Sequence, residues 1–269
     1  MLSPMTRTVT LVALAAVSLP LAVHAAPPPP DAVRQQASAA APGGDLASLL
    51  AESDEAYTRR DDAAQLAVAK ARLADAEKLA PGDFEVLWRL ARLNVWLADD
   101  LKISGEEKSR LGKIAWDFGD RASAANPARV EGWYWAAAGM GLYGLGIGVI
   151  TALRQGIEPK FKERLGHAER IDAGYQHGGI QTAWGRFYFK LPWPKYDPRK
   201  SEEQLLAALQ RNPANVRAHV YLAELLTKED RSPEAQAQLQ AAIAQPPGQY
   251  DPPEERRWQE EARRLLRGR

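Results

Sequence analysis

The segment that decides the fold runs from Val216 to Gln249 and reads VRAHVYLAELLTKEDRSPEAQAQLQAAIAQPPGQ. Its first half contains the apolar and small pair Leu222-Ala223. Its second half places small or apolar residues at helical spacing, at Ala235, Leu239 and Ala242. Pro247 then ends the segment, because proline cannot continue a helix. The segment therefore predicts two helices that pack against each other, followed by a stop.

The pattern of the second half recurs at four places upstream. Two copies keep its spacing of four, three and five residues: Ala69, Leu73, Ala76 and Pro81, and Ala115, Gly119, Ala122 and Pro127. Two further copies with the same spacing are looser in residue type: Ser201, Leu205, Ala208 and Pro213, and Phe161, Leu165, Ala168 and Ala173, which lacks the proline. Two antiparallel helices need small residues where they cross closely and a larger apolar residue that fills the gap. The recurrence therefore predicts an array of helix hairpins.

Position by position over 34 residues, the segment 216–249 resembles a tetratricopeptide repeat, and the resemblance covers most of residues 60–250. Strand-like alternation is almost absent. These observations predict an all-α fold, an α-solenoid of tetratricopeptide-like helix hairpins with irregular, longer units in the middle. The longer units indicate longer helices or inserted loops, such as residues 98–112. The C-terminal tail carries a modest apolar side and is expected to cap the last repeat. That side consists of Trp258, Leu265 and Leu266.

The irregular middle resembles a second family. Its segments are WYWAAAGMGLYGLGIGVITALRQG at 133–156, RIDAGYQHGGIQTAWGRFYFKLPWP at 170–194 and KSEEQLLAAL at 200–209. They look like the helical T component associated with periplasmic TRAP transporters, the TatT family. The resemblance implies an exported, tetratricopeptide-like helical protein that works beside a substrate-binding protein in ligand uptake. Many members of that family are lipoproteins, and this chain departs from them because it has no Cys.

The N-terminal region predicts export. Arg7 is followed by an apolar run at 9–23, and the small residues before Ala26 match a signal-peptidase site. We expect residues 1–25 to be a secretory signal peptide, cleaved near Ala25; a retained membrane anchor is the alternative. Residues 26–44 are rich in Pro and Ala and predict a disordered leader, and residues 45–269 form the repeat domain. The expected location is periplasmic or secreted, and the absence of Cys excludes a lipid-modified cysteine.

Charge and composition narrow the classes of partner. Lys and Arg total 35 against 34 Asp and Glu, so nothing in the charge balance calls for nucleic acid or an anionic membrane surface. Beyond the signal segment only three His remain, at 167, 177 and 219, and they lack metal-ligand spacing. We expect no metal and no cofactor.

Two motifs resemble parts of enzymes. Gly139, Gly141 and Gly144 satisfy G-x-G-x-x-G, but a dinucleotide site needs a preceding strand, and EGWYWAAA is helical in character. The sequence HGG at 177–179 resembles an esterase oxyanion loop, which needs a G-x-S-x-G elbow that the chain lacks. The sequence therefore predicts a protein that is not an enzyme.

Residues 132–153 carry no charge and allow three interpretations. The favoured one is a buried helix followed by a Gly-rich turn. Within it, the segment could line an apolar ligand cavity. The third interpretation is a membrane-spanning helix, since 22 uncharged residues are long enough to cross a bilayer.

Aromatic and basic residues in the middle of the chain are the candidate ligand-binding residues. They are Trp133, Tyr134, Tyr143, Trp184, Arg186, Tyr188 and Trp193. Arg186, Lys190 or Lys195 could meet a ligand carboxylate. Gly178 and Gly179 are expected in a turn before a new helix, and Pro192 is expected to stop that helix. The alternative for each ring is packing between neighbouring repeat units.

Two functions follow from these observations. The first is binding of a small apolar or amphipathic ligand beside a TRAP-type periplasmic substrate-binding protein. The second is a protein-interaction scaffold in envelope assembly or secretion, with another envelope protein as partner. A closed apolar pocket at 133–150 and 184–193 would favour the first, and an open polar groove the second. Membrane contact is not expected, and an oligomer is compatible with either.

Overall fold

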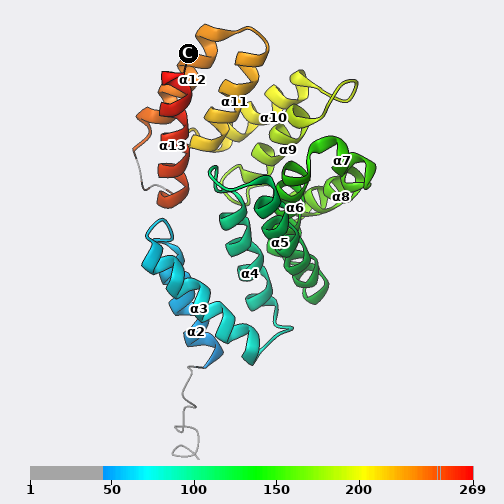
Figure 1. The fold of residues 1–269 in the computed structure, drawn as a ribbon, viewed down its shortest axis with the longest axis vertical. Helices are drawn as coiled ribbons and strands as arrows, with labels where there is room; N and C mark the ends of the chain where they lie inside the picture. The colour runs from blue at the N-terminus through cyan, green and yellow to red at the C-terminus, as the bar shows by residue number, and fades with distance from the viewer. Residues whose placement is uncertain (1–44, 247, 249, 269) are drawn as a thin grey trace, which may run out of the picture. The chain divides into compact units, whose positions relative to one another are not determined.

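The computed structural model describes residues 45–246, 248 and 250–268. The predicted signal peptide (1–25) and leader (26–44) lie outside these residues. Within the described part every regular element is a helix, which confirms the all-α prediction (Figure 1). The helices are α2 (Leu46–Tyr57), α3 (Ala63–Leu79), α4 (Phe84–Ala98), α5 (Gly105–Ala125), α6 (Val130–Ile147), α7 (Val149–Arg154), α8 (Ile157–Ile171), α9 (Gly179–Lys190), α10 (Pro198–Arg211), α11 (Val216–Lys228), α12 (Ser232–Ala244) and α13 (Pro252–Arg267).

The helices pair in sequence order as hairpins. The pairs are α2 with α3, α4 with α5, α6 with α8, α9 with α10 and α11 with α12 (Figure 1). The short helix α7 is inserted into the third pair. The repeated pattern occupies the second helix of each pair, and its small and apolar residues are buried. The hairpin array predicted from the spacing is thereby confirmed.

Local sequence sets where the helices begin and end. At half of the described helix starts a side chain of Asp or Asn accepts backbone N–H bonds, which satisfies donors that the helix itself leaves free. These caps include Asp45, Asp62, Asp83, Asp197, Asn215 and Asp251. Three helices stop two residues before a proline, because proline disfavours helical geometry in the residue that precedes it. They are α3, α5 and α10, followed by Pro81, Pro127 and Pro213.

Helices α5 and α6 approach each other more closely than side chains would allow. Glycines recur every seven residues on both, at Gly105, Gly112 and Gly119 and at Gly132, Gly139 and Gly146. A Cβ atom at Gly139 would lie 2.5 Å from the backbone nitrogen of Trp116. A Cβ atom at Gly112 would lie 2.5 Å from the backbone nitrogen of Tyr143. Backbone therefore packs on backbone along this pair.

Two expectations for the middle of the chain need correction. Residues 98–112 are not mainly an inserted loop, because α4 ends at Ala98 and α5 begins at Gly105. The extra length of this unit is helix. The Gly-rich segment is also largely helical, since α6 continues to Ile147 and turns only at Gly148, whose φ is 86°. Packing against α5 offsets the weak helix propensity of these glycines.

The membrane-spanning interpretation of 132–153 fails on length and continuity. The segment is divided between α6 and α7 at Gly148. In the part of the chain that the structure describes, no helix combines the length and apolar character needed to cross a bilayer.

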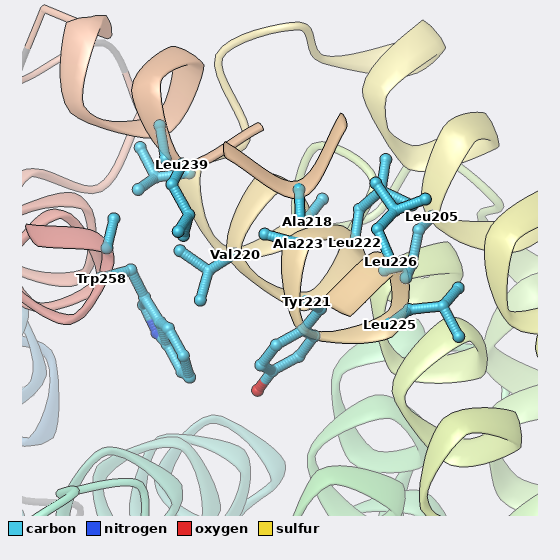
Figure 2. Close-up of a cluster of buried hydrophobic side chains, with 14 of the residues drawn as sticks. Leu205, Ala218, Val220, Tyr221, Leu222, Ala223, Leu225, Leu226, Leu239 and Trp258 are labelled. Atoms are coloured by element: carbon cyan, nitrogen blue, oxygen red, sulfur yellow. The ribbon is translucent and has the colours of Figure 1, made fainter. Parts of the chain in front are cut away.

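The C-terminal helix closes the last core. Trp258 of α13 is 2% exposed and meets Tyr221 of α11 edge to face, with ring centroids 5.0 Å apart (Figure 2). Leu265 and Leu266 pack against the same core, which confirms that the tail caps the array.

The same helix contacts the first two hairpins through polar groups. Arg60, after α2, is bonded to Asp251, and Arg256 of α13 is bonded to Asp61. Arg257 donates to the backbone oxygen of Trp96 in α4. We call these contacts the polar seam. The buried apolar clusters of the first and last hairpins are separate, so the seam joins them mainly by charge.

Candidate ligand-binding cavity

A cavity of about 730 Å³ lies along the first helices of the hairpins. Helices α2, α4, α6, α9 and α11 all contribute to its wall, together with α7 and α13. Of the second helices, α8 alone reaches it in the described part of the chain. This arrangement follows from the repeats, because the small residues of the second helices are used for packing and the first helices form the inner surface.

One end of the cavity is mainly apolar, and the one acidic side chain from α8 in its described wall is Glu158, which is paired with Lys162 and Lys195. This end is formed by α6, α7, α8 and α9, and its lining includes Met140, Leu145, Val149, Leu153, Ile157, Phe161, Phe187 and Leu191. Gly141 and Gly144 also lie in this wall. A Cβ atom at Gly141 would come no closer than 3.7 Å to the Phe161 ring, so the missing side chain at this position leaves space for a ligand.

The other end is charged and lies at the polar seam. Arg217 donates to Asp99 at 2.6 Å and to Glu254 at 2.9 Å. Nη2 of Arg60 donates to both oxygens of Asp251, at 2.7 and 2.6 Å. Burial raises the pKa of the Glu254 carboxyl, and the nearby acids add to this rise, whereas Arg217 opposes it. Each of these charges has a partner of opposite sign.

Aromatic residues separate the two ends. Tyr134 meets Trp135 and Tyr175 edge to face, with centroids 4.9 and 5.1 Å apart. Burial raises the pKa of Tyr134, so its hydroxyl stays protonated. Tyr221 lies under the Arg186 guanidinium, whose carbon is 4.1 Å from the ring centroid. These groups give the middle of the cavity apolar faces and hydroxyl donors.

Two of the seven candidate ligand-binding residues, Tyr134 and Arg186, line the cavity. Nη1 of Arg186 donates to Glu224 at 2.6 Å.

The other five lie outside the cavity wall. The Trp133 ring stacks on His167 at 4.4 Å, and Tyr143 donates to Gln155 at 2.8 Å. Trp184 donates to Glu169 at 3.1 Å, and Tyr188 stacks on Trp184. Trp193 is 89% exposed. Four of these rings therefore pack between or along helices, and the fifth faces solvent.

The expected turn precedes α9. Gly178 has φ 92°, a left-handed conformation that favours glycine, and α9 begins at Gly179. A Cβ atom at Gly179 would lie 2.7 Å from the Tyr134 hydroxyl oxygen, so the turn also brings this hydroxyl close to the backbone. Pro192 follows the last residues of α9. The rings of His177 and Tyr250 are in contact at a tilt of 42°, with centroids 4.3 Å apart.

The charged end was missed at the sequence level. Arg60, Asp99, Arg217 and Glu254 come from four distant parts of the chain, and each resembles an ordinary solvated charge on a helix surface. A weak signal existed for the apolar end, because Gly141 belongs to the G-x-G-x-x-G pattern. Among residues 45–246 and 250–268, no group of three His, Cys, Asp or Glu could hold a metal ion.

Hairpins in sequence order and an inner wall built from first helices define a tetratricopeptide-like helical-repeat protein. A solved structure of a thermophilic TPR protein from Thermus thermophilus has this fold, with a TM-score of 0.61. It is 22% identical, and the match covers 82% of this chain and 100% of that one. Residues 49–191 match the family described as RMD1-3, Regulator of microtubule dynamics protein 1-3, and the chain belongs to this family. A comparison with curated proteins found no match.

Proposed function

We propose that this protein binds one amphipathic organic molecule in its cavity. The observation that carries the proposal is the cavity itself, at about 730 Å³ with one apolar and one charged end. Small-molecule sites typically occupy about 300–1,000 Å³ and combine apolar walls with a few polar groups. Apolar side chains from α6 to α9 would take the hydrocarbon part of the ligand, and polar groups would orient it.

A role in TRAP-type uptake extends this proposal. It is supported by the resemblance of 133–156 and 170–194 to the TatT family and by the predicted signal peptide. In this role the protein passes a ligand to or from a periplasmic substrate-binding protein. Affinity purification from cells should then recover such a binding protein, and recovery of cytoplasmic proteins alone would contradict the extension.

Protein interaction is the second candidate function. The described surface exposes Trp193 at 89% and Ile150 at 58%, both outside the cavity. Exposed aromatic residues are common anchors for protein partners. The family description concerns regulation of microtubule dynamics. From that description we propose for this chain only that its helical array binds another protein. Loss of a partner on Trp193→Ala, with ligand binding unchanged, would support this function.

Native mass spectrometry tests ligand binding. We expect the protein purified from its own host to carry one organic molecule per chain. Replacing Gly141 by phenylalanine should reduce the carried fraction at least fivefold, because the new ring enters the apolar end. A phenyl ring would occupy a considerable part of the apolar end, because a cavity of about 150 Å³ is enough to hold benzene.

The matched control is Gly166→Phe in α8, which lies outside the cavity wall, with Arg170 its near neighbour. This variant should retain the ligand. The proposal would be contradicted by a wild-type protein that carries no molecule and takes up none when offered a neutral aromatic probe.

A further inference from the structure

Among the described residues, five Lys and Arg side chains line the cavity, and four of them are held by a carboxylate. The pairs are Arg60 with Asp251, Arg92 with Asp54, Arg186 with Glu224, and Arg217 with both Asp99 and Glu254. The fifth is Lys190, in the last turn of α9. Within the described part of the chain, its ammonium has neither a carboxylate partner nor a hydrogen-bond acceptor.

The surroundings of Lys190 make an unpaired charge costly. Its side chain is half-buried, and burial lowers the pKa of Lys190. Arg186 and Lys228 lower it further, while Glu224 has the opposite effect and is already bonded to Arg186. The C-terminal end of a helix favours a cation and leaves carbonyl oxygens free, but within the described part of the chain none of them accepts a hydrogen bond from the Lys190 ammonium. An anion placed beside Lys190 would relieve both the desolvation and the repulsion.

The position of Lys190 fits the head group of an amphipathic ligand. Phe187 and Leu191, its close neighbours in sequence, belong to the apolar end of the cavity. Of the three cations considered from the sequence, Lys195 lies outside the wall and is bonded to Glu158. Arg186 lines the cavity but is shared with Glu224. Lys190 alone of these three lies in the wall without a carboxylate partner, and its ammonium nitrogen lies 5.1 Å from the centroid of the Phe189 ring.

We infer that Lys190, with Arg186 one helical turn away, binds the anionic head of an amphipathic ligand whose apolar part fills the space between α6, α7 and α8. The head is a carboxylate, sulfonate or phosphate ester. This inference rests on the proposed function and adds the ligand class to it: an organic anion with a hydrocarbon body. A free inorganic anion is a different outcome of the test, because it would leave the apolar end unused.

Two fluorescent probes that share one ring skeleton distinguish binding of the anionic head group from binding of the apolar part. 8-Anilinonaphthalene-1-sulfonate carries an anion, and N-phenyl-1-naphthylamine lacks it. We expect both probes to bind the folded wild-type protein. Lys190→Gln should weaken binding of the sulfonate at least tenfold and change binding of the neutral amine less than twofold. Lys102→Gln, which removes an exposed lysine outside the cavity wall, should change neither.

Each contrary result has a distinct meaning. Unchanged binding of the sulfonate by Lys190→Gln, with the neutral amine still bound, would overturn the inference and leave the proposed function intact. Failure of both probes to bind the wild type would overturn the proposed function itself. Decanoate should displace the sulfonate probe, whereas acetate and inorganic phosphate at equal concentration should not. Equal displacement by the small anions would overturn the amphipathic assignment.

Discussion

Replacing Gly139 by alanine is expected to lower the free energy of unfolding by about 2–3 kcal/mol, the upper range for overpacking a well-packed core. The added Cβ would lie 2.5 Å from the backbone nitrogen of Trp116. A backbone atom in a helix cannot rotate away as a side chain would, so α5 and α6 must separate. The loss should exceed the gain of about 1 kcal/mol that alanine brings to a helix interior. Urea denaturation followed by circular dichroism measures the change.

Gly141→Ala is the matched control, two residues further along α6. Its Cβ would have the Phe161 ring as its near neighbour, at 3.7 Å, an ordinary contact distance. Helix propensity then dominates, and this variant should be as stable as the wild type or more stable by up to about 1 kcal/mol. Equal destabilisation by both variants would contradict the close backbone packing of α5 and α6.

The second large effect is expected at the polar seam. Arg60→Ala should lower the free energy of unfolding by about 2–3 kcal/mol, because Arg60 is the buried member of a partly buried ion pair and its removal leaves the Asp251 charge uncompensated. Arg60 is 4% exposed and bonded to Asp251. Its guanidinium also lies over the rings of Tyr57 and Trp96, at 4.2 and 4.3 Å, and these contacts would be lost as well.

Arg59→Ala provides the comparison for this prediction. Arg59 is adjacent in sequence, but its side chain is 57% exposed and its partner Glu55 is on the same helix surface. Such surface pairs contribute about 0.5 kcal/mol or less. Thermal unfolding of the two variants, each measured at low and high salt, should show a large loss for Arg60 alone. A loss at Arg60 no greater than that at Arg59 would mean that the seam does not join the two ends of the array.

The fold could be predicted from sequence because the repeat pattern reflects the packing of neighbouring helices against each other. Ala69, Leu73 and Ala76 are fully buried, as their spacing predicts, and the same holds for Ala235, Leu239 and Ala242. Small residues at fixed helical spacing are typical of close helix crossings, and proline marks the end of most units. The seven-residue spacing of glycines on α5 and α6 is also visible in the sequence, but the G-x-G-x-x-G motif that includes Gly139 and Gly141 overlaps it and hides it.

The site was harder to predict because it is built from distant segments. Aromatic residues such as Trp133 and Trp184 cluster in the sequence, yet their indole N–H groups are satisfied by Pro127 and Glu169 outside the cavity. A high density of aromatic residues in the sequence therefore indicates packing between helices more than it indicates the lining of a pocket. The shape of the cavity depends on the rotation of each hairpin relative to the next, and no short sequence motif predicts that rotation. Lys190 differs from the other cations of the cavity wall in having no carboxylate partner, which is a property of the folded chain.

The most direct test of ligand binding is a crystal structure of the protein with 11-bromoundecanoate, in which anomalous diffraction locates the bromine. We predict one bromine peak per chain in the apolar end, near Gly141 and Leu153, with the carboxylate beside Lys190. No bromine in the cavity at saturating ligand, or peaks confined to the outer surface, would contradict the claim that the repeat array encloses a binding site for organic anions.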